Sequence, residues 1–219
     1  MCARARSETA AVLTGDFVDS SKVAPQALET GMRLVAEVAA ALGGPAARFT
    51  RFRGDGWQFH LAAPGLALRA ALLATARLRA VEAGLATRAA IGIGGIGSLG
   101  GADLADAGGP AFEASGRALD AIPRGRRLAL AGDGATPARR IVVDLLDERA
   151  GRWTAPQAEA LALHLDTAAP TLAAIAERLG ITPQAVGYRL AGAGGPTLRR
   201  CLRLWEADWA GEAEAEAGS

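Results

Sequence analysis

The sequence predicts an α/β protein of the α+β class followed by a small all-helical domain. Three observations lead to this prediction. Strand and helix patterns alternate up to about residue 146, and only helical patterns occur from about residue 152 to 209. Half of the 219 residues are hydrophobic, so the chain can bury a substantial core. We therefore expect two domains, at 9–146 and 152–209, followed by a disordered acidic tail at 210–219.

The first domain begins with a buried strand, AAVLT, and continues with an amphipathic helix at about 24–43. The segments ARFTRFRG and WQFHLA predict a hairpin that turns at Gly54-Asp55. A second helix is expected at about 65–84. The next strand is TRAAIGIGGIGSL, whose glycines permit close approach of another backbone.

The remainder of this domain adds one helix and two strands. Pro110 is expected to open the helix, which ends near Ile122. The short segments RLALAG and RRIVVDLL then predict two strands that complete a mixed sheet. The resulting order, β-α-β-β-α-β-α-β, is that of a ferredoxin-like core with additions.

Capping signals divide the second domain into four short helices. Thr154 with Gln157 forms a capping-box pattern, Thr171 is a predicted N-cap, and Thr182 precedes a proline at a first helical position. The tryptophans of this region are expected to be packing anchors, and the two histidines of the chain to be surface or boundary residues. These residues are Trp153, Trp205, Trp209, His60 and His164.

The composition narrows the class of protein. The longest apolar stretches are interrupted by arginine at helical spacing, and the segment MCARARSE has no apolar core, so we expect neither a membrane span nor a signal peptide. A cytoplasmic location follows. The net charge is +1, so any binding to nucleic acid must come from a local patch.

Two Gly-Asp dipeptides carry the first chemical hypothesis. Asp16 ends the first strand, and Asp55 lies at the tip of the hairpin. Two such carboxylates can converge as ligands for Mg²⁺, which accompanies nucleotide phosphates. The residues after Asp16 include Phe17, Asp19 and Ser20, in a turn that can offer backbone N–H groups to phosphate. The alternative is that both motifs are turn and capping residues only.

A third element lies in the predicted helix GPAFEASGRAL. Glu113 and Arg117 are four residues apart and therefore share a face of this helix. Such a pair is usually a surface ion pair, but an arginine in this place can also bind polyphosphate as a bidentate donor.

These motifs together resemble a known group of proteins. The strand ending in Asp16, the hairpin with Gly54-Asp55, the IGIGGIG strand and the GPAFEASGRAL helix look like the palm-type fold of class III nucleotidyl cyclases. Within that group the chain is most similar to the bacterial SatD family, which adds a C-terminal helix-turn-helix. The resemblance covers roughly residues 9–205, and four motifs occur in the expected order.

The resemblance implies a role for particular residues. It places Asp16 and Asp55 at the two metal-binding aspartates, with Mg²⁺ as the possible cofactor, and Arg117 at the transition-state arginine. It places Arg51 where cyclases have a base-selecting lysine, and Asp106 at its acidic partner. Glu113 stands where cyclases have a ribose-orienting asparagine, and a carboxylate there cannot donate the amide hydrogen bond. Because cyclase sites combine residues of two protomers, the resemblance also implies a homodimer.

The segment TLAAIAERLGITPQAVGYRL predicts a helix-turn-helix. Its first helix is expected at 171–179 and its second from Pro183, with Leu172 among the inward residues. We expect DNA contacts from the second helix and from the last helix, at Thr182, Gln184, Tyr188, Arg189 and Arg199. The alternative is a helical packing or dimerisation domain.

The leading hypothesis is a DNA-binding transcription regulator whose degenerate cyclase-like domain binds a nucleotide or cyclic-nucleotide signal. The second hypothesis is an active Mg²⁺-dependent nucleotidyl cyclase or related enzyme, in which Arg117 is catalytic. The third is a scaffold that uses the palm fold only for dimerisation.

Overall fold

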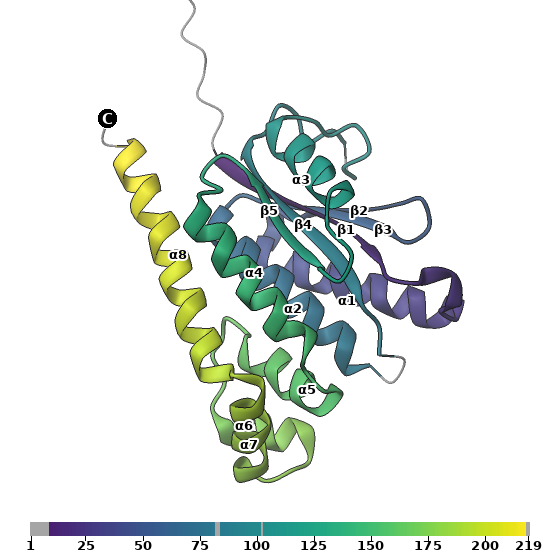
Figure 1. Ribbon diagram of the computed structural model, residues 1–219, viewed down its shortest axis with the longest axis vertical. Helices are drawn as coiled ribbons and strands as arrows, with labels where there is room; N and C mark the ends of the chain where they lie inside the picture. The colour runs from purple at the N-terminus through teal and green to yellow at the C-terminus, as the bar shows by residue number, and fades with distance from the viewer. Residues whose placement is uncertain (1–8, 82–83, 102, 218–219) are drawn as a thin grey trace, which may run out of the picture.

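A computed structural model of the chain describes residues 9–81, 84–101 and 103–217 (Figure 1). Its centre is a five-stranded mixed sheet in the order β2-β3-β1-β4-β5. Only β4 and β5 are parallel, and the other neighbouring strands are antiparallel. The strands are β1 (Thr9–Phe17), β2 (Arg48–Phe52), β3 (Gly56–Leu61), β4 (Thr87–Gly95) and β5 (Leu128–Gly132). The α+β class is therefore confirmed, with β2-β3-β1-β4 in the ferredoxin-like order.

Helices cover both faces of the sheet. On one face α1 (Pro25–Gly43) packs against β2 and β3, and α2 (Ala67–Ala80) packs against β1 and β4. On the other face α3 (Pro110–Asp120) packs against β1, β4 and β5 (Figure 1). The inward side chains of β3, which include Trp57, Phe59 and Leu61, are fully buried on the α1–α2 side. This alternation follows from the period of two along a strand.

The predicted strand RRIVVDLL is wrong, because these residues lie in α4 (Pro137–Gly151). Thr136 is the N-cap and accepts a hydrogen bond from the backbone N–H of Arg139, and Pro137 occupies the first turn. The apolar residues of α4 lie on two faces, with Val143 buried and Ile141 58% exposed. A helix with this distribution lacks a single apolar stripe, so the β-branched run resembles a strand in the sequence.

The remaining helices follow the predicted capping signals. They are α5 (Ala155–His164), α6 (Leu172–Leu179), α7 (Pro183–Ala193) and α8 (Gly195–Ala217). The capping box at Thr154 and Gln157 is present. Trp153, Trp205 and Trp209 are buried as predicted. α5 packs against α2, and one apolar core continues from the sheet into this helical part.

Two further expectations for the helical part are wrong. The backbone of residues 210–217, predicted as a disordered tail, continues α8, because alanine and glutamate are strong helix formers and nothing there ends the helix. Leu172, predicted to face inward, is 45% exposed at the first position of α6. Within the described residues, no helix is long and apolar enough to cross a membrane.

Candidate functional site

The pairing of three strands brings the two Gly-Asp motifs together at one end of the sheet. In the ladders beside β1, Asp16 lies opposite Gly56 of β3 on one side and Arg88 of β4 on the other. The backbone N–H of Phe17 also donates to the carbonyl of Asp55, at 3.3 Å. The strand register therefore places the backbones of the two Gly-Asp motifs side by side at this end of the sheet.

The local structure requires or favours glycine at both motif positions, Gly15 and Gly54. A Cβ atom at Gly15 would lie 2.3 Å from the Trp57 ring and 2.4 Å from the carbonyl oxygen of Arg88. No side chain fits in that space. Gly54 has φ 84°, in the left-handed region that glycine adopts without a steric penalty. Gly15 thus permits the close packing of β1 beside Asp16, and Gly54 permits the hairpin turn that contains Asp55.

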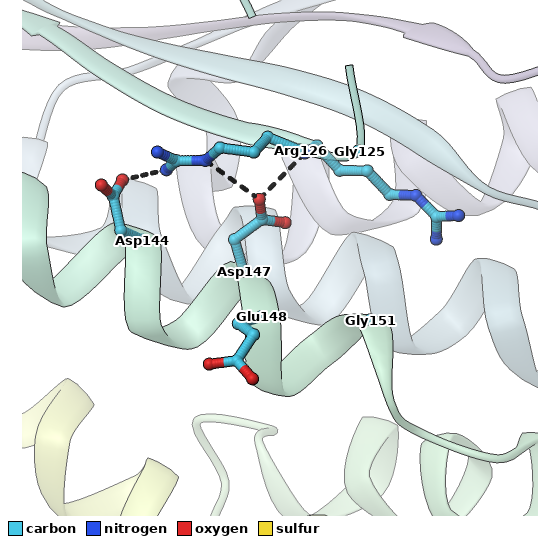
Figure 2. Close-up of a pocket in the computed structure, with 7 residues that line it drawn as sticks. Gly125, Arg126, Asp144, Asp147, Glu148 and Gly151 are labelled. Carbon is cyan, nitrogen blue, oxygen red and sulfur yellow. Dashed lines mark hydrogen bonds and ion pairs between the residues drawn. The ribbon is translucent and has the colours of Figure 1, made fainter. Parts of the chain in front are cut away.

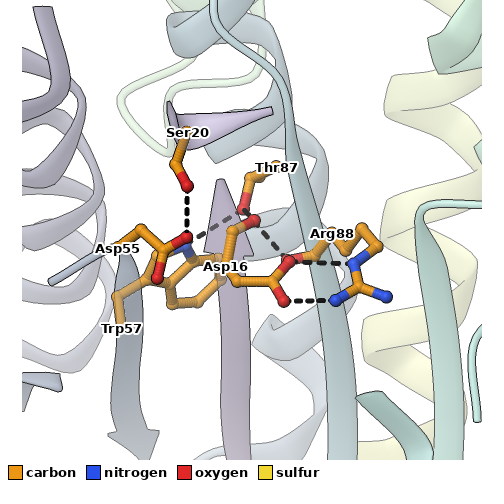
Figure 3. Close-up of polar contacts among 6 residues, drawn as sticks. All are labelled: Asp16, Ser20, Asp55, Trp57, Thr87 and Arg88. Carbon is orange, nitrogen blue, oxygen red and sulfur yellow. Dashed lines mark hydrogen bonds and ion pairs between the residues drawn. The ribbon is translucent and has the colours of Figure 1, made fainter. Parts of the chain in front are cut away.

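A chain of hydrogen bonds fixes the end of β1 (Figure 3). The Trp57 indole N–H donates to the Thr87 hydroxyl at 3.0 Å, and this hydroxyl donates to the backbone carbonyl of Asp16 at 2.7 Å. Trp57 and Thr87 are both buried. Hydrogen bonds in a buried network hold their partners in one arrangement. The backbone beneath the Asp16 carboxylate is therefore well ordered.

The two carboxylates have different partners (Figure 3). Arg88 binds both oxygens of Asp16, with Nε 2.9 Å from Oδ1 and Nη2 donating to Oδ2. The hydrogen bond to Asp16 is the first cause that raises the pKa of Arg88, and the charges of Asp16, Asp120 and Asp55 raise it further. The Ser20 hydroxyl donates to Asp55 Oδ2 at 2.5 Å. Asp16 is thus neutralised within the chain, and Asp55 is held by a hydroxyl.

The loop after β1 has a backbone suited to anions. Asp19 is left-handed, with φ 53°, and a 3-10 turn at Ser20–Lys22 follows it directly. Successive residues of opposite hand turn their N–H groups toward one concave side, which binds anions. The Asp19 side chain points to Lys22, 3.2 Å away. Phe17 is 3% exposed and packs in the core, so it supports this loop rather than facing a ligand.

Several residues implied by the cyclase resemblance are bound to other groups. Arg51 donates to Glu29 of α1 at 2.5 Å and to the carbonyl of Gly54. Arg117 pairs with Glu113 at 3.2 Å on the exposed face of α3. Asp106 is exposed in the segment between β4 and α3. Among the described residues, no hydrogen bond or ion pair joins these side chains to Asp16 or Asp55.

The arrangement of Asp16 and Asp55 does not fit a divalent metal ion. Mg²⁺ binding requires carboxylate oxygens that are free to coordinate. Both oxygens of Asp16 already accept hydrogen bonds from Arg88. In the described part of the chain, no group of three or more metal-ligating side chains comes together.

The two helices expected in the helix-turn-helix segment are present as α6 and α7, joined by a tight turn. Gly180 ends α6 in the left-handed conformation, with φ 63°, and the N–H of Ile181 donates back to the carbonyl of Ala176 at 3.1 Å. Thr182 caps α7 by accepting the N–H of Ala185. α7 packs against both α5 and α6. The buried contacts come from Ile175, Ala176, Val186 and Leu190.

The side chains predicted to contact DNA differ in exposure and in whether they are paired within the chain. Tyr188 is 72% exposed on α7, and Gln184 is exposed one turn earlier on the same helix. Arg189 instead forms an ion pair with Glu159 of α5 at 2.7 Å. Arg199 donates to the carbonyl of His164 at 2.5 Å. The outward surface of α7 is therefore polar, and its arginine connects α7 to α5.

A groove of about 470 Å³ lies between α4 and the segment before β5 (Figure 2). Asp147 is buried in it and accepts the backbone N–H of Arg127 at 2.9 Å. Arg126 pairs with Asp144. The charges in the groove thus largely bind one another. The lining residues are Gly125, Arg126, Arg127, Asp144, Asp147, Glu148 and Gly151.

Sequence reasoning missed the environments of three residues, Arg88, His60 and His164. Arg88 was not among the predicted site residues, although it lies in the quoted strand TRAAIGIGGIGSL. Its partner is 72 residues away in sequence, and only the strand register shows the pairing. The two histidines were predicted at the surface or its boundary, but His60 and His164 are 6% and 7% exposed.

Comparison with known proteins adds no identification. No protein-family model matches this chain, and no curated protein matches it.

Proposed function

We propose that this protein is a DNA-binding transcription regulator whose ferredoxin-like domain binds a nucleotide or cyclic-nucleotide signal. The observation that carries the proposal is the helix-turn-helix formed by α6 and α7. Its second helix presents Gln184 and Tyr188 to the outside, and the apolar residues of both helices pack inward. A cytoplasmic location belongs to this proposal.

The outward side chains of α7 suit contact with a DNA duplex. In helix-turn-helix proteins the second helix enters the major groove. There glutamine pairs with adenine through two hydrogen bonds, and other polar side chains bind base edges or phosphates. Arg178 of α6 and Arg200 and Arg203 of α8 are exposed, and they supply cations for phosphate contacts. Arg200 and Arg203 were expected from the sequence, beside Arg199, to contact the DNA backbone.

The signal site of this proposal lies at the end of β1. The left-handed Asp19 and the 3-10 turn after it provide backbone N–H groups for a phosphate. The Ser20 hydroxyl, which donates to Asp55, stands at the same end of the sheet. These polar groups, together with the sequence resemblance, support a nucleotide as the signal.

The ion pairs of this domain favour sensing over turnover. Cyclisation needs cations that stabilise charge on a polyphosphate as it reacts. Arg51 and Arg117 are each paired with a glutamate of the same chain.

The proposal includes a homodimer. Helix-turn-helix dimers bind two half-sites that are roughly 34 Å apart, one turn of the duplex. Two copies of α7 would then have to lie at that spacing or a multiple of it.

Selection from a random library of DNA duplexes tests the DNA assignment. The full chain is expected to enrich one short motif. Gln184→Ala and Tyr188→Ala are each expected to weaken binding of that duplex by about tenfold. Arg33→Ala, which changes an exposed residue of α1, serves as the control and is expected to bind like the wild type. Failure to enrich any duplex contradicts the proposal.

A melting-temperature screen of nucleotides and cyclic nucleotides tests the signal. At least one ligand is expected to raise the melting temperature of the wild type, because ligands that bind only the folded state stabilise it. Ser20→Ala is expected to reduce that rise. If no nucleotide shifts the melting temperature, the sensory part of the proposal is wrong, and the DNA assignment is unaffected.

A further inference from the structure

We infer that the guanidinium of Arg88 is a built-in cation that binds the Asp16 carboxylate in place of a divalent metal ion. The inference deepens the proposed function, because it makes ligand binding at this site independent of metal. The geometry of the Asp16 carboxylate carries it.

The pairing is built into the sheet. Asp16 and Arg88 are direct cross-strand partners in the antiparallel ladder of β1 and β4. Side chains at such positions leave the sheet on the same face, only about 5 Å apart at Cβ. The guanidinium can therefore bind both carboxylate oxygens side by side, which is the strongest arrangement for this kind of pair.

The pKa of Arg88 is raised first by its hydrogen bond to Asp16, and the charges of two further carboxylates, Asp120 and Asp55, raise it further. Asp120 ends α3, where the partial negative charge of a helix C-terminus adds to the field. The guanidinium thus pairs with one carboxylate in a locally acidic environment.

A divalent ion and Arg88 would compete for the same oxygens. Mg²⁺ and Mn²⁺ are bound by carboxylate oxygens, and these must first lose other strong partners. In the wild type, a metal ion at Asp16 would have to displace a bidentate guanidinium. Without the guanidinium, the Asp16 carboxylate would lose its counter-charge, and its oxygens would be free to bind a divalent ion.

Titration with Mn²⁺ alone, followed by electron paramagnetic resonance, tests the inference. The wild type is expected to show no saturable binding of Mn²⁺, whereas Arg88→Gln is expected to show one saturable site that binds Mn²⁺ at least about tenfold more tightly than any residual binding by the wild type. Arg88→Lys keeps one positive charge and is expected to behave like the wild type. The double variant Asp16→Asn with Arg88→Gln is expected to lose the new site.

Melting temperatures give a second measurement if Arg88→Gln is unstable without metal. Mn²⁺ is then expected to raise the melting temperature of Arg88→Gln and to leave that of the wild type unchanged. Wild-type binding of Mn²⁺ that depends on Asp16 would overturn the inference. A folded Arg88→Gln variant without a gain in Mn²⁺ affinity would overturn it as well.

These outcomes are independent of the proposed function. The Mn²⁺ titration uses neither nucleotide nor DNA, so its result stands even if the protein binds no nucleotide. If a nucleotide does raise the melting temperature, the rise is expected to be the same with and without Mg²⁺.

Discussion

The end of the sheet and the α6–α7 unit differ in where their polar side chains direct their hydrogen bonds. At the end of the sheet, Asp16 is paired with Arg88, and Asp55 accepts from Ser20. On α7, Tyr188 is 72% exposed, and its one described hydrogen bond is a long 3.5 Å contact with Gln184 of the same helix. The carboxylates of the first region are bound by side chains of the same chain, whereas the polar side chains on α7 are exposed and available to a partner.

This difference shows that a polar side chain in a functional motif can be assigned a ligand only after its partners within the chain are known. A carboxylate in a nucleotide-type motif is a metal ligand only if its oxygens are free. Gln184 and Tyr188 of α7 are exposed, and their one described hydrogen bond is with each other, so both side chains can still contact a partner. The two regions therefore differ in whether their polar side chains are paired within the chain, and this pairing cannot be seen in the sequence.

Truncation of Trp57 is expected to have the largest effect on the ordered end of the sheet. Trp57 is fully buried, stacks on Phe59 and donates to Thr87. Trp57→Ala is expected to lower the free energy of unfolding by about 3–5 kcal/mol. Denaturant unfolding measures this loss, and Trp153→Phe, at another buried tryptophan, is the milder comparison. A loss near zero would show that the network does not hold the end of β1.

Acid is expected to weaken the helical part through His164. Burial, and then the charge of Arg199, lower the pKa of His164 to about 4. Between the unfolded value near 6.5 and this folded value, the unfolded state binds more protons, so stability falls as pH falls. From pH 7 to pH 5 this residue is expected to cost about 2 kcal/mol.

The variant His164→Gln serves as the control for this pH effect. It lacks the titrating ring and is expected to show a smaller fall in stability over the same pH range. Urea unfolding at both pH values provides the comparison. An equal fall in the wild type and His164→Gln would assign the pH dependence to other groups.

Removal of the Asp16 charge is expected to have a moderate effect. Asp16→Asn leaves Arg88 without its ionised partner, and the pair is partly exposed, so the free energy of unfolding is expected to drop by about 1 kcal/mol. Asp55→Asn, which keeps an acceptor for Ser20, is expected to have a smaller effect. Thermal unfolding of both variants compares them, and a larger loss for Asp55→Asn would reverse the assigned roles.

The outward residues of α7 are expected to have the smallest effect on stability. Tyr188→Ala removes an exposed side chain and is expected to change the free energy of unfolding by less than about 0.5 kcal/mol. Chemical denaturation tests this. A loss above about 1 kcal/mol would mean that Tyr188 packs within its own chain and is not kept for a partner.

Local signals predicted much of the fold. Periodicity predicted the strands β1 to β5, and the capping residues Thr154, Thr171 and Thr182 marked the starts of three helices. The helix α4 was missed because Ile141 and Leu145 are exposed, so its apolar residues do not form one stripe. The N-cap at Thr136 was the signal that could have corrected this.

The sequence predicted the two aspartates of the candidate site but not the arginine that pairs with one of them. Asp16 and Asp55 belong to short motifs, and they were predicted at the end of the first strand and at the tip of a hairpin. Arg88 belongs to a different strand, and its role depends on the register between β1 and β4, which sequence patterns leave open. In the same way, the partners of Arg189 and Arg199 lie 30 and 35 residues away and come together only through helix packing.

Fluorescence anisotropy with the selected DNA duplex tests the contrast between the two regions most directly. The wild type, Tyr188→Ala and Asp55→Asn are compared in the same buffer and salt, without nucleotide. We predict that Tyr188→Ala binds about tenfold more weakly and that Asp55→Asn binds within about twofold of the wild type. Wild-type affinity in Tyr188→Ala would contradict the assignment of DNA recognition to α7.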